Sequence, residues 1–248
     1  MLHIVSWNIQ GDRGDIGRVA RTLRELGDLD VICLQQVTAG PAQGDQFAAL
    51  GAQLSGYAAF SAIANEVRDG QTGNMIFTRW PVARVLRHCL PWPADAAVAT
   101  TPRAALEVTL DSPLGPLRVT CCHLEYFSPR QRMAQVEALR ALHVQAHGHA
   151  CTTPALLVGD FNCLPASPDH ARLLAPFDGA APALRDAWQL THRGEHHAPT
   201  VGVYDGADPP FTFDYMLACE ALAPRVESLA VVGARGGSQH QPLVLRLA

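Results

Sequence analysis

Polar residues that can move protons or bind oxyanions stand directly behind apolar, strand-like runs at several points of this chain. Asn8 follows Leu2–Trp7, His123 follows Leu117–Cys122, and Asp160 follows the apolar run Ala155–Val158. Strand ends that meet at one edge of a sheet are where α/β folds build sites, because the rigid backbone fixes the side chains beyond them. Hydrolysis of a phosphate ester needs a cation and fixed donors around the oxygens that gain charge, together with a proton-transfer group such as histidine. Asn, His and Asp at such positions supply groups of the kinds that this chemistry needs.

The hydrophobic pattern predicts the elements that position these residues. Residues 2–8 are typical of a strand, residues 15–26 of a helix with one apolar face, and residues 30–37 of a second, buried strand, so the chain opens as an α/β arrangement. Further strands are expected at 57–62, 74–78, 83–90, 103–110, 117–124, 155–158, and near 211–217, 226–232 and 243–247, with a weaker helix at 43–54. The clearest helix has Ser128 as its N-cap and Pro129 at its first position, and it extends to about Gly148.

The organisation of the chain predicts one domain over residues 1–248. No internal repeat or long low-complexity linker interrupts the 248 residues, and the segment 114–116 suits a short hairpin turn. A chain of this length can bury enough apolar surface to fold without a metal or disulfide.

Composition restricts the environment and the partners. The formal net charge is −4 and no basic block stands out, which argues weakly against a duplex-DNA specialist. Seven cysteines, an odd number without a C-x-x-C pair, favour buried thiols in a reducing compartment. The N-terminus lacks the pattern of a signal peptide and no long apolar run suggests a membrane span. We therefore expect a cytoplasmic, monomeric protein with no membrane contact and no obligate protein partner.

Six short segments, taken in order, make a more specific pattern. The motifs WN, LQ, HL, GDFN, DY and S-x-H-x-P run from Trp7 to Pro242 and so cover nearly the whole chain. In this order they resemble the endonuclease/exonuclease/phosphatase superfamily, the deoxyribonuclease-I-like hydrolases. The resemblance implies an α/β fold, a deoxyribonuclease-I-like sandwich of two mixed β-sheets flanked by helices.

The resemblance also implies roles for the residues at the strand ends. Asn8 would help to hold a metal ion or the attacked phosphate, and His123 would contact the phosphate and assist the leaving group. Asp160 would align or deprotonate the attacking water, while Asn162 would steady the phosphate oxygens.

Four further positions complete the expected site. His240 would act on the phosphate as a hydrogen-bond donor or acid–base partner, with Asp214 orienting its ring. Asn74, in a segment similar to the family's GN strand, would line the cleft. Arg103 is the first residue of the strand predicted at 103–110, and two interpretations stay open for it: contact with the substrate phosphate or a structural ion pair.

Two positions depart from the family pattern. The metal-binding glutamate expected after Leu34-Gln35 is Gln36, and the aspartate expected before His240 is Gln239. Mg²⁺ prefers charged oxygen ligands, and an amide oxygen brings no charge. On a Coulomb argument two lost charges weaken cation binding by roughly several kcal/mol. We therefore expect Asn8, Gln36 and Gln239 to bind Mg²⁺ or Mn²⁺ weakly. Glu125 is a candidate replacement carboxylate, with a solvated strand end as the alternative.

Two functional hypotheses follow. The first is a metal-dependent hydrolase of phosphodiester or phosphomonoester bonds in nucleic acid or a small molecule. The second is a catalytically impaired relative that binds a phosphate-bearing ligand or a protein.

Other polar and aromatic residues favour structural interpretations. His143 and His147 stand four apart, a spacing that can grip Zn²⁺, but no third ligand is evident and a helix C-terminus favours histidine in any case. We interpret Arg132 and Gln135 as residues that brace their helix. The tryptophans are interpreted as packing residues, namely Trp7, Trp80, Trp92 and Trp188.

Overall fold

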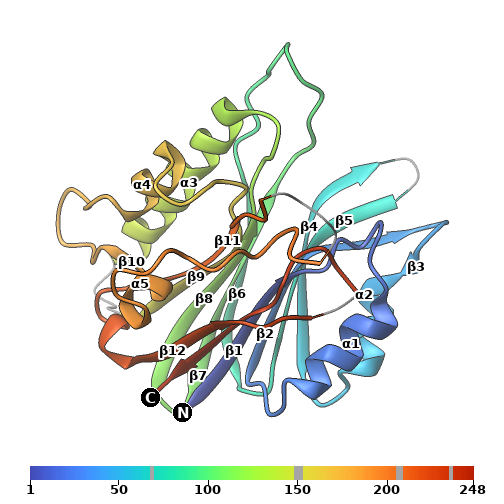
Figure 1. Cartoon of the computed structure of the whole chain (residues 1–248), viewed down its shortest axis with the longest axis horizontal. Coiled ribbons are helices and arrows are strands. Elements are labelled where there is room, and N and C mark those ends of the chain that lie inside the picture. The colour runs from blue at the N-terminus through green and yellow to red at the C-terminus, as the bar shows by residue number, and fades with distance from the viewer. Residues whose placement is uncertain (68–69, 148–152, 205–208, 235–236) are drawn as a thin grey trace.

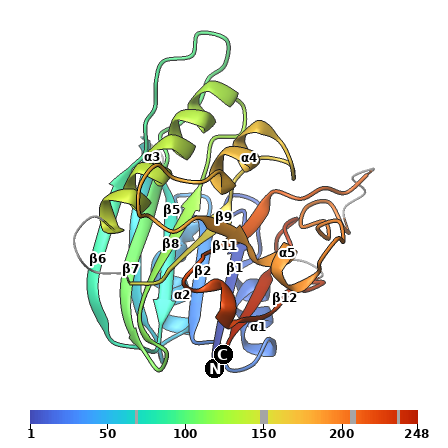
Figure 2. The same ribbon diagram turned by 90° about the vertical axis from the view of Figure 1, so that its left-hand side faces the viewer.

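Two β-sheets pack face to face, with helices on their outer sides (Figures 1 and 2). The computed structural model describes residues 1–67, 70–147, 153–204, 209–234 and 237–248. The strand order of the first sheet is β12 (Val226–Val231), β13 (Leu243–Leu247), β1 (Leu2–Asn8), β2 (Val31–Gly40), β5 (Gly70–Thr78) and β4 (Ala58–Val67), with β3 (Gly44–Asp45) paired to β2. The order of the second is β10 (Leu184–Asp186), β11 (Asp214–Cys219), β9 (Ala155–Asp160), β8 (Gly115–His123), β7 (Ala104–Ser112) and β6 (Val82–Cys89).

Both sheets are mixed. In the first sheet β1 runs parallel to β2 and antiparallel to β13. In the second sheet β8 runs parallel to β9 and antiparallel to β7. The predicted sandwich of two mixed sheets flanked by helices is therefore confirmed.

The central strand β1 is buried on both faces, which explains its nearly continuous apolar sequence. Ile4 points into the core between the sheets, whereas Val5 and Trp7 point toward the opposite side. There they pack with Val19 and Leu23 of helix α1 (Ile16–Glu25). Helix α2 (Gln46–Gln53) contributes to the same outer layer, so the chain's first third supplies most of the first sheet and its cover, and β12 and β13 from the C-terminal end complete the sheet.

The second sheet is covered by α3 (Pro129–His147) and α4 (Pro168–Leu174) (Figure 2). Ser128 caps α3 as predicted, because its Oγ accepts a hydrogen bond from the Gln131 N–H at 3.2 Å. Gly148, the predicted end of this helix, lies outside the described residues.

Differences between expectation and structure occur mainly in short elements. The chain also forms α4, α5 (Ala187–Thr191), β3, β10 and the 3₁₀ turn Ala223–Arg225, none of which the hydrophobic pattern predicts because each is too short to show a period. The strand expected near 211–217 is β11, and it begins at Asp214. Phe211 lies outside it and makes an isolated bridge with Val201. Trp92 is half exposed and is not the packing residue that we expected, whereas Trp7 is fully buried.

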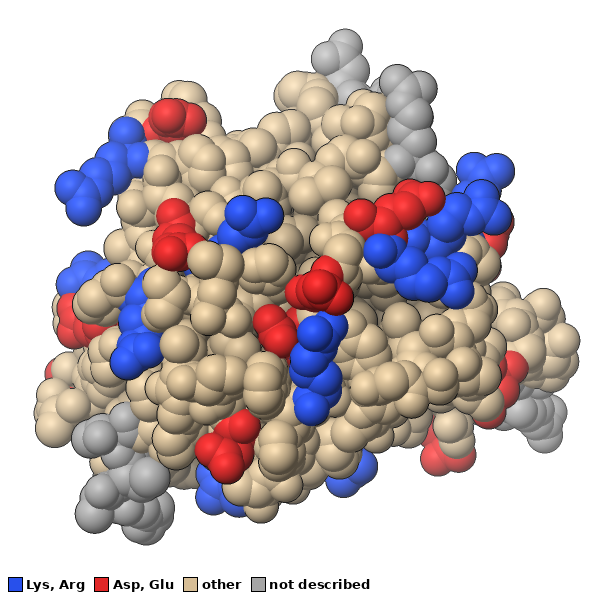
Figure 3. All heavy atoms as spheres, turned by 90° about the horizontal axis from the view of Figure 1, so that it is seen from below, with Lys and Arg blue, Asp and Glu red and all other residues tan. Residues whose placement is uncertain are grey.

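The surface agrees with the sparse charge of the sequence. Seen from below Figure 1, arginine side chains are interspersed with Asp and Glu over the described residues (Figure 3). None of the described helices has both the length and the apolar character needed to cross a membrane.

Candidate active site

Strand ends from both sheets bring the predicted residues to one edge of the sandwich. His123 at the end of β8 and Asp214 at the start of β11 are both register partners of Asp160, which ends β9 between them. Asn8 ends β1 of the other sheet, and its Nδ2 donates to Asp160 Oδ2 at 2.8 Å. The site is therefore built across the two sheets, with Asp160 as the point where they meet.

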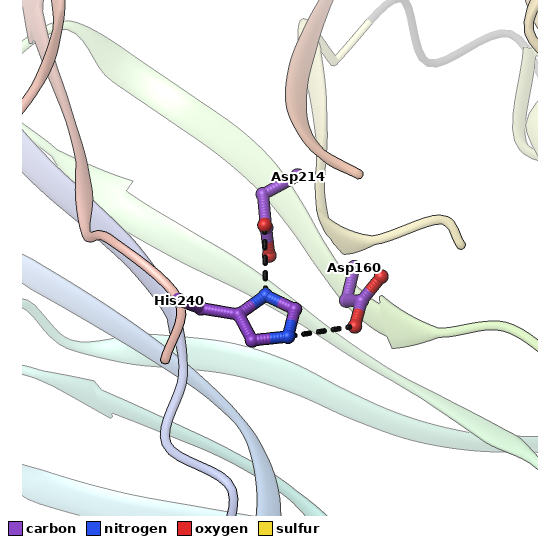
Figure 4. A group of neighbouring side chains, drawn as sticks. All are labelled: Asp160, Asp214 and His240. Atoms are coloured by element: carbon purple, nitrogen blue, oxygen red, sulfur yellow. Dashed lines mark hydrogen bonds and ion pairs between the residues drawn. The ribbon is translucent and has the colours of Figure 1, made fainter. Parts of the chain in front are cut away.

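The His240 ring lies between two carboxylates, as Figure 4 shows. Its Nδ1 is 2.9 Å from Asp214 Oδ2, and its Nε2 is 3.9 Å from Asp160 Oδ2. Each of the three residues is almost fully buried. Because the ring is held through one nitrogen, the other nitrogen is directed at Asp160 and the pocket, which is the arrangement of a positioned proton-transfer group.

The loop that carries His240 is tied to β1. Trp7 Nε1 donates to the His240 carbonyl at 2.8 Å. The Ser238 hydroxyl donates to the Asn8 carbonyl at 2.6 Å and accepts from the His240 N–H at 3.1 Å. The serine of S-x-H-x-P and the tryptophan of WN thus place His240 opposite Asp160, a positioning role that residue type alone did not indicate.

Thr200 is a site residue that the sequence reasoning missed. Its buried hydroxyl donates to Asp214 Oδ2 at 2.6 Å and accepts from the Phe213 N–H at 3.1 Å. The Asp214 carboxylate is thereby fixed from two sides, by Thr200 and by His240, although its Oδ1 has no partner among the described residues. No local motif identifies Thr200, because it lies in an irregular loop and reaches Asp214 only through the fold.

Asp160 is fixed by the turn that follows it. The Asn162 N–H donates to Asp160 Oδ1 at 2.9 Å, and Asn162 Nδ2 donates to the Leu124 carbonyl at 2.8 Å. Asn162 has φ +50°, a left-handed conformation that asparagine tolerates better than most residues. Asn162 lies at the site as predicted, and it also holds the carboxylate in place.

His123 is a neutral ring beside a fixed cation. Burial lowers its pKa to about 3, and the Arg103 guanidinium also lowers it, against the opposing effect of Asp160. Arg103 Nη1 lies 3.2 Å from His123 Nε2, and the latter is 3.5 Å from Asp160 Oδ2. Near pH 7 the positive charge on this side of the pocket therefore belongs to Arg103, and His123 serves as a neutral hydrogen-bonding group.

Glu125 is engaged elsewhere and does not line the cavity, so its geometry does not support the role of a replacement metal ligand. Its Oε2 accepts from Arg103 Nε and Nη2, both at 3.2 Å, and its Oε1 accepts from the Phe127 N–H at 2.7 Å. The side chain is also buried, so the alternative of a solvated strand end is wrong as well. Arg103 thus makes the structural ion pair and also lines the cavity, whereas its contact with a substrate phosphate stays a prediction.

The two glutamines form the exposed rim of the site. Gln36, at a bulge in β2 with φ +57°, donates from Nε2 to Asp12 Oδ1 at 2.9 Å. Gln239 pairs with Gln10, whose Nε2 donates to Gln239 Oε1 at 3.0 Å and whose Oε1 accepts from the Gln239 N–H at 2.9 Å. A carboxylate that the sequence analysis did not consider, Asp12, therefore stands next to the position of the expected glutamate.

A cavity of about 600 Å³ connects these groups. Of the predicted site residues it is lined by Asn8, Gln36, Asn74, Arg103, His123, Asp160, Asn162, Gln239 and His240. Asp214 lies behind His240 and does not line it. Asn74 lines it as expected, but its Nδ2 also donates to the Ala104 carbonyl at 2.8 Å, which ties β5 to the second sheet.

The zinc interpretation of the helical histidines receives no geometric support. His143 contacts the Pro182 carbonyl through Nε2 at 2.8 Å and Arg118 through Nδ1 at 3.2 Å, so both ring nitrogens are engaged. Among the described residues, the group that could hold a metal through His, Cys, Asp or Glu is Asp160, Asp214 and His240, with ligand atoms within 4.8 Å of one another. The bracing residues behave as predicted, since Arg132 Nη1 binds the Glu125 carbonyl at 3.0 Å and Gln135 Oε1 accepts from the Glu125 N–H at 2.9 Å.

Comparison with known proteins agrees with this geometry. The model of the endonuclease/exonuclease/phosphatase family matches residues 5–238. A structure described as an endonuclease/exonuclease/phosphatase from Beutenbergia cavernae DSM 12333 is 23% identical with a TM-score of 0.74, over 100% of this chain and 72% of that one. The mannosyl-6-phosphatase of Bacteroides thetaiotaomicron VPI-5482 is 16% identical with a TM-score of 0.77, over 100% of both chains. D. rerio TDP2, complexed with single strand DNA product, is 22% identical with a TM-score of 0.72, over 100% of this chain and 98% of that one. No curated protein matches.

Proposed function

Because the chain belongs to the endonuclease/exonuclease/phosphatase family, we propose that it is a metal-dependent hydrolase of phosphodiester or phosphomonoester bonds. The observation that carries this proposal is the position of the His240 ring between Asp214 and Asp160, at the base of a cavity that Arg103 and His123 also line. Asp160 and His240 are a buried pair that can act as base and acid, and the Arg103 guanidinium beside them is a fixed cation. This arrangement suits attack of water on a phosphate ester.

The proposed roles follow from the hydrogen bonds. Asp160 Oδ2 accepts from Asn8 at 2.8 Å and faces the Nε2 atoms of His123 and His240, so it aligns a water molecule and takes its proton. His240, held by Asp214, donates through Nε2 to a phosphate oxygen. Arg103 attracts the same anion with its guanidinium.

The oxygen atoms at the rim suit a hard divalent cation, but few of them carry a negative charge. The Asp12 carboxylate accepts from Gln36 Nε2 through Oδ1, and its Oδ2 forms an exposed ion pair with Arg13 Nε at 3.7 Å, which a cation would have to displace. Gln36 Oε1 and this carboxylate line the same cavity as Asp160 and are oxygen ligands of the kind that Mg²⁺ prefers. The Gln239 oxygen is already paired with Gln10. Bound here, Mg²⁺ or Mn²⁺ would neutralise charge on the phosphate oxygens. We propose that Asp12 and Gln36 hold it together with Asp160, and that the amide at position 36 makes binding weaker than a glutamate would.

The substrate is proposed to be a phosphate ester of nucleic acid or of a small molecule. A mannosyl-6-phosphatase and TDP2 complexed with single strand DNA product share this fold, so the fold is compatible with either class. The small net charge favours a short or single-stranded substrate over a long duplex.

We also propose a reducing, cytoplasmic location. Cys33, Cys89, Cys121, Cys122, Cys163 and Cys219 are free thiols, and all but Cys89 are buried. Cys151 lies outside the described residues.

The proposal is tested by hydrolysis of bis(p-nitrophenyl) phosphate and p-nitrophenyl phosphate with Mg²⁺ or Mn²⁺. The wild type should be active, and Asp160→Asn, which keeps the shape of the side chain, should lose about 10³-fold in rate. Asp28→Asn is the control, because the Asp28 side chain is 97% exposed and lies outside the cavity. An inactive wild type that becomes active as the double variant Gln36→Glu, Gln239→Asp would support the impaired, ligand-binding relative instead.

A further inference from the structure

One wall of the cavity is aromatic and extends beyond the groups that handle the phosphate. Tyr126, Phe127, Phe211 and Phe213 all line the same space as Asp160 and His240. A cavity of about 600 Å³ is within the range that binds whole small ligands rather than a phosphate alone. Chemistry at phosphorus alone therefore does not explain why this wall of the cavity is aromatic.

The four rings form a continuous surface. Tyr126 meets Phe127 edge-to-face, with centroids 4.9 Å apart and an interplanar angle of 84°, and it meets Phe213 at 5.9 Å. Phe213 in turn lies 4.6 Å from Phe211. These contacts restrict the orientation of the rings, whose planes are inclined to their neighbours by 84°, 64° and 59°, so the cavity is bordered by separate ring faces and edges.

Two of these rings are unusually exposed. Phe127 is 62% exposed and Tyr126 is 50% exposed. Other large hydrophobic side chains in the described part of the chain are also exposed, but only these two line the cavity. Leaving aromatic surface in water forgoes the free energy of burial, so exposure at a ligand cavity points to a surface that the ligand covers.

The backbone beneath the two rings is held rigidly. Arg132 Nη1 donates to the carbonyls of Glu125 and Tyr126 at 3.0 and 2.9 Å, and the Phe127 N–H donates to Glu125 Oε1 at 2.7 Å. The other oxygen of the same carboxylate binds Arg103 at 3.2 Å. Glu125 thus couples the guanidinium that faces the anion to the aromatic rings beside it, which preorganises a site for a ligand with both a charged and a planar part.

We propose that Tyr126 and Phe127 form a stacking subsite for the base of a nucleotide whose phosphate lies at Asp160 and His240. This inference rests on the proposed function and narrows its substrate class. Stacking on aromatic side chains tolerates every base, because each base offers a π-face, and it requires no long basic groove. It therefore suits a chain of net charge −4.

The test is calorimetric titration of the Mn²⁺-loaded protein with inorganic phosphate, mannose 6-phosphate and deoxyadenosine monophosphate. The nucleotide should bind at least about ten times more tightly than the other two, and Phe127→Ala should remove about ten-fold of nucleotide affinity while phosphate affinity stays within two-fold. Val144→Ala is the matched control, because Val144 is an exposed apolar side chain on α3 that does not line the cavity. Phe127 is so exposed that its truncation should not impair folding.

The outcomes separate this inference from the proposed function. Equal affinity for nucleotide and sugar phosphate, or equal loss of phosphate and nucleotide binding in Phe127→Ala, would overturn the stacking subsite while hydrolysis of chromogenic esters persists. Nucleotide binding that depends on Phe127, in a protein without hydrolytic activity, would support the subsite and refute the hydrolase. A 5′-phosphorylated tetranucleotide compared with the mononucleotide then distinguishes a strand end from a free nucleotide as the source of the base.

Discussion

The buried wall and the exposed rim of one cavity differ in how closely they follow the family pattern. On the buried wall, Asp160 and His240 line the cavity and Asp214 lies directly behind the His240 ring. All three have the residue types that the family resemblance implies, and each is at most 5% exposed. On the rim, Gln36 is half-buried and Gln239 is exposed, and these are the two positions that depart from it.

The difference follows from how much stability a substitution would cost at each of the two places. Replacing a member of the buried wall leaves a partner such as Thr200 or Asp214 without its hydrogen bond and without water. At the rim, the hydrogen bonds of Gln36 with Asp12 and of Gln239 with Gln10 are exposed, so a change between amide and carboxylate there leaves no buried atom without a partner.

The largest expected effect is on activity, from Asp214→Asn on the buried wall. An amide cannot hold His240 Nδ1 as the carboxylate does, so the rate should fall about 10³-fold. The matched control is Asp186→Asn, because Asp186 is equally buried and lies 3.4 Å from a histidine, His170, away from the cavity. Steady-state kinetics on a chromogenic phosphodiester should show loss only in the first variant. Equal rates in both variants would show that the pairing of Asp214 with His240 has no part in catalysis.

The effects of Thr200→Val and Gln239→Ala on the free energy of unfolding test the difference between the buried wall and the rim. Valine matches the shape of threonine but leaves Asp214 Oδ2 and the Phe213 N–H without the hydroxyl, so the free energy of unfolding should fall by about 1–3 kcal/mol. Gln239→Ala, at an exposed site, should change it by less than about 0.5 kcal/mol. Urea unfolding monitored by circular dichroism measures both. If Gln239→Ala destabilised the protein as much as Thr200→Val, substitutions at the rim would not be better tolerated than those at the buried wall.

The buried wall should also make stability depend on pH. The pKa of His123 is lowered to about 3 in the folded state from its usual value near 6.5, so below pH 6.5 the unfolded chain binds the proton that the folded chain refuses. Stability should therefore fall as the pH drops from 6.5 toward 3, with His123 contributing a slope of at most about 1.4 kcal/mol per pH unit. His123→Asn should reduce this slope in urea titrations with EDTA present. Part of the slope that remains is expected from His143, whose pKa burial lowers to about 4, and part from His88 and His197, whose pKa values burial also lowers.

The smallest effect concerns metal affinity at the rim. Gln36→Glu adds a charge beside Asp12 and should strengthen Mn²⁺ binding about five- to ten-fold, whereas Asp12→Asn should weaken it by a similar factor. Calorimetry with Mn²⁺ measures both, and Asp28→Asn again controls for a distant surface charge. Unchanged affinity in Asp12→Asn would mean that this carboxylate does not replace the missing glutamate.

The sequence alone determined the layers of the fold and the polar residues at the strand ends. Long strands such as β1 and β8 and the capped helix α3 carry their period and boundary signals locally, so they were predictable within a few residues. The ordered motifs likewise named Asp160, Asp214 and His240 before any contact was known.

Only the tertiary structure decided which partners those residues take. It assigned Glu125 to Arg103 instead of a metal ion, placed Asp12 beside Gln36, and brought Thr200 to Asp214. These pairs join segments 14 to 24 residues apart through loops whose paths have no periodic signal. The physical reason is that burial and hydrogen bonding are properties of the packed chain: a residue type states what a group can do, and the neighbours it meets decide whether it does so.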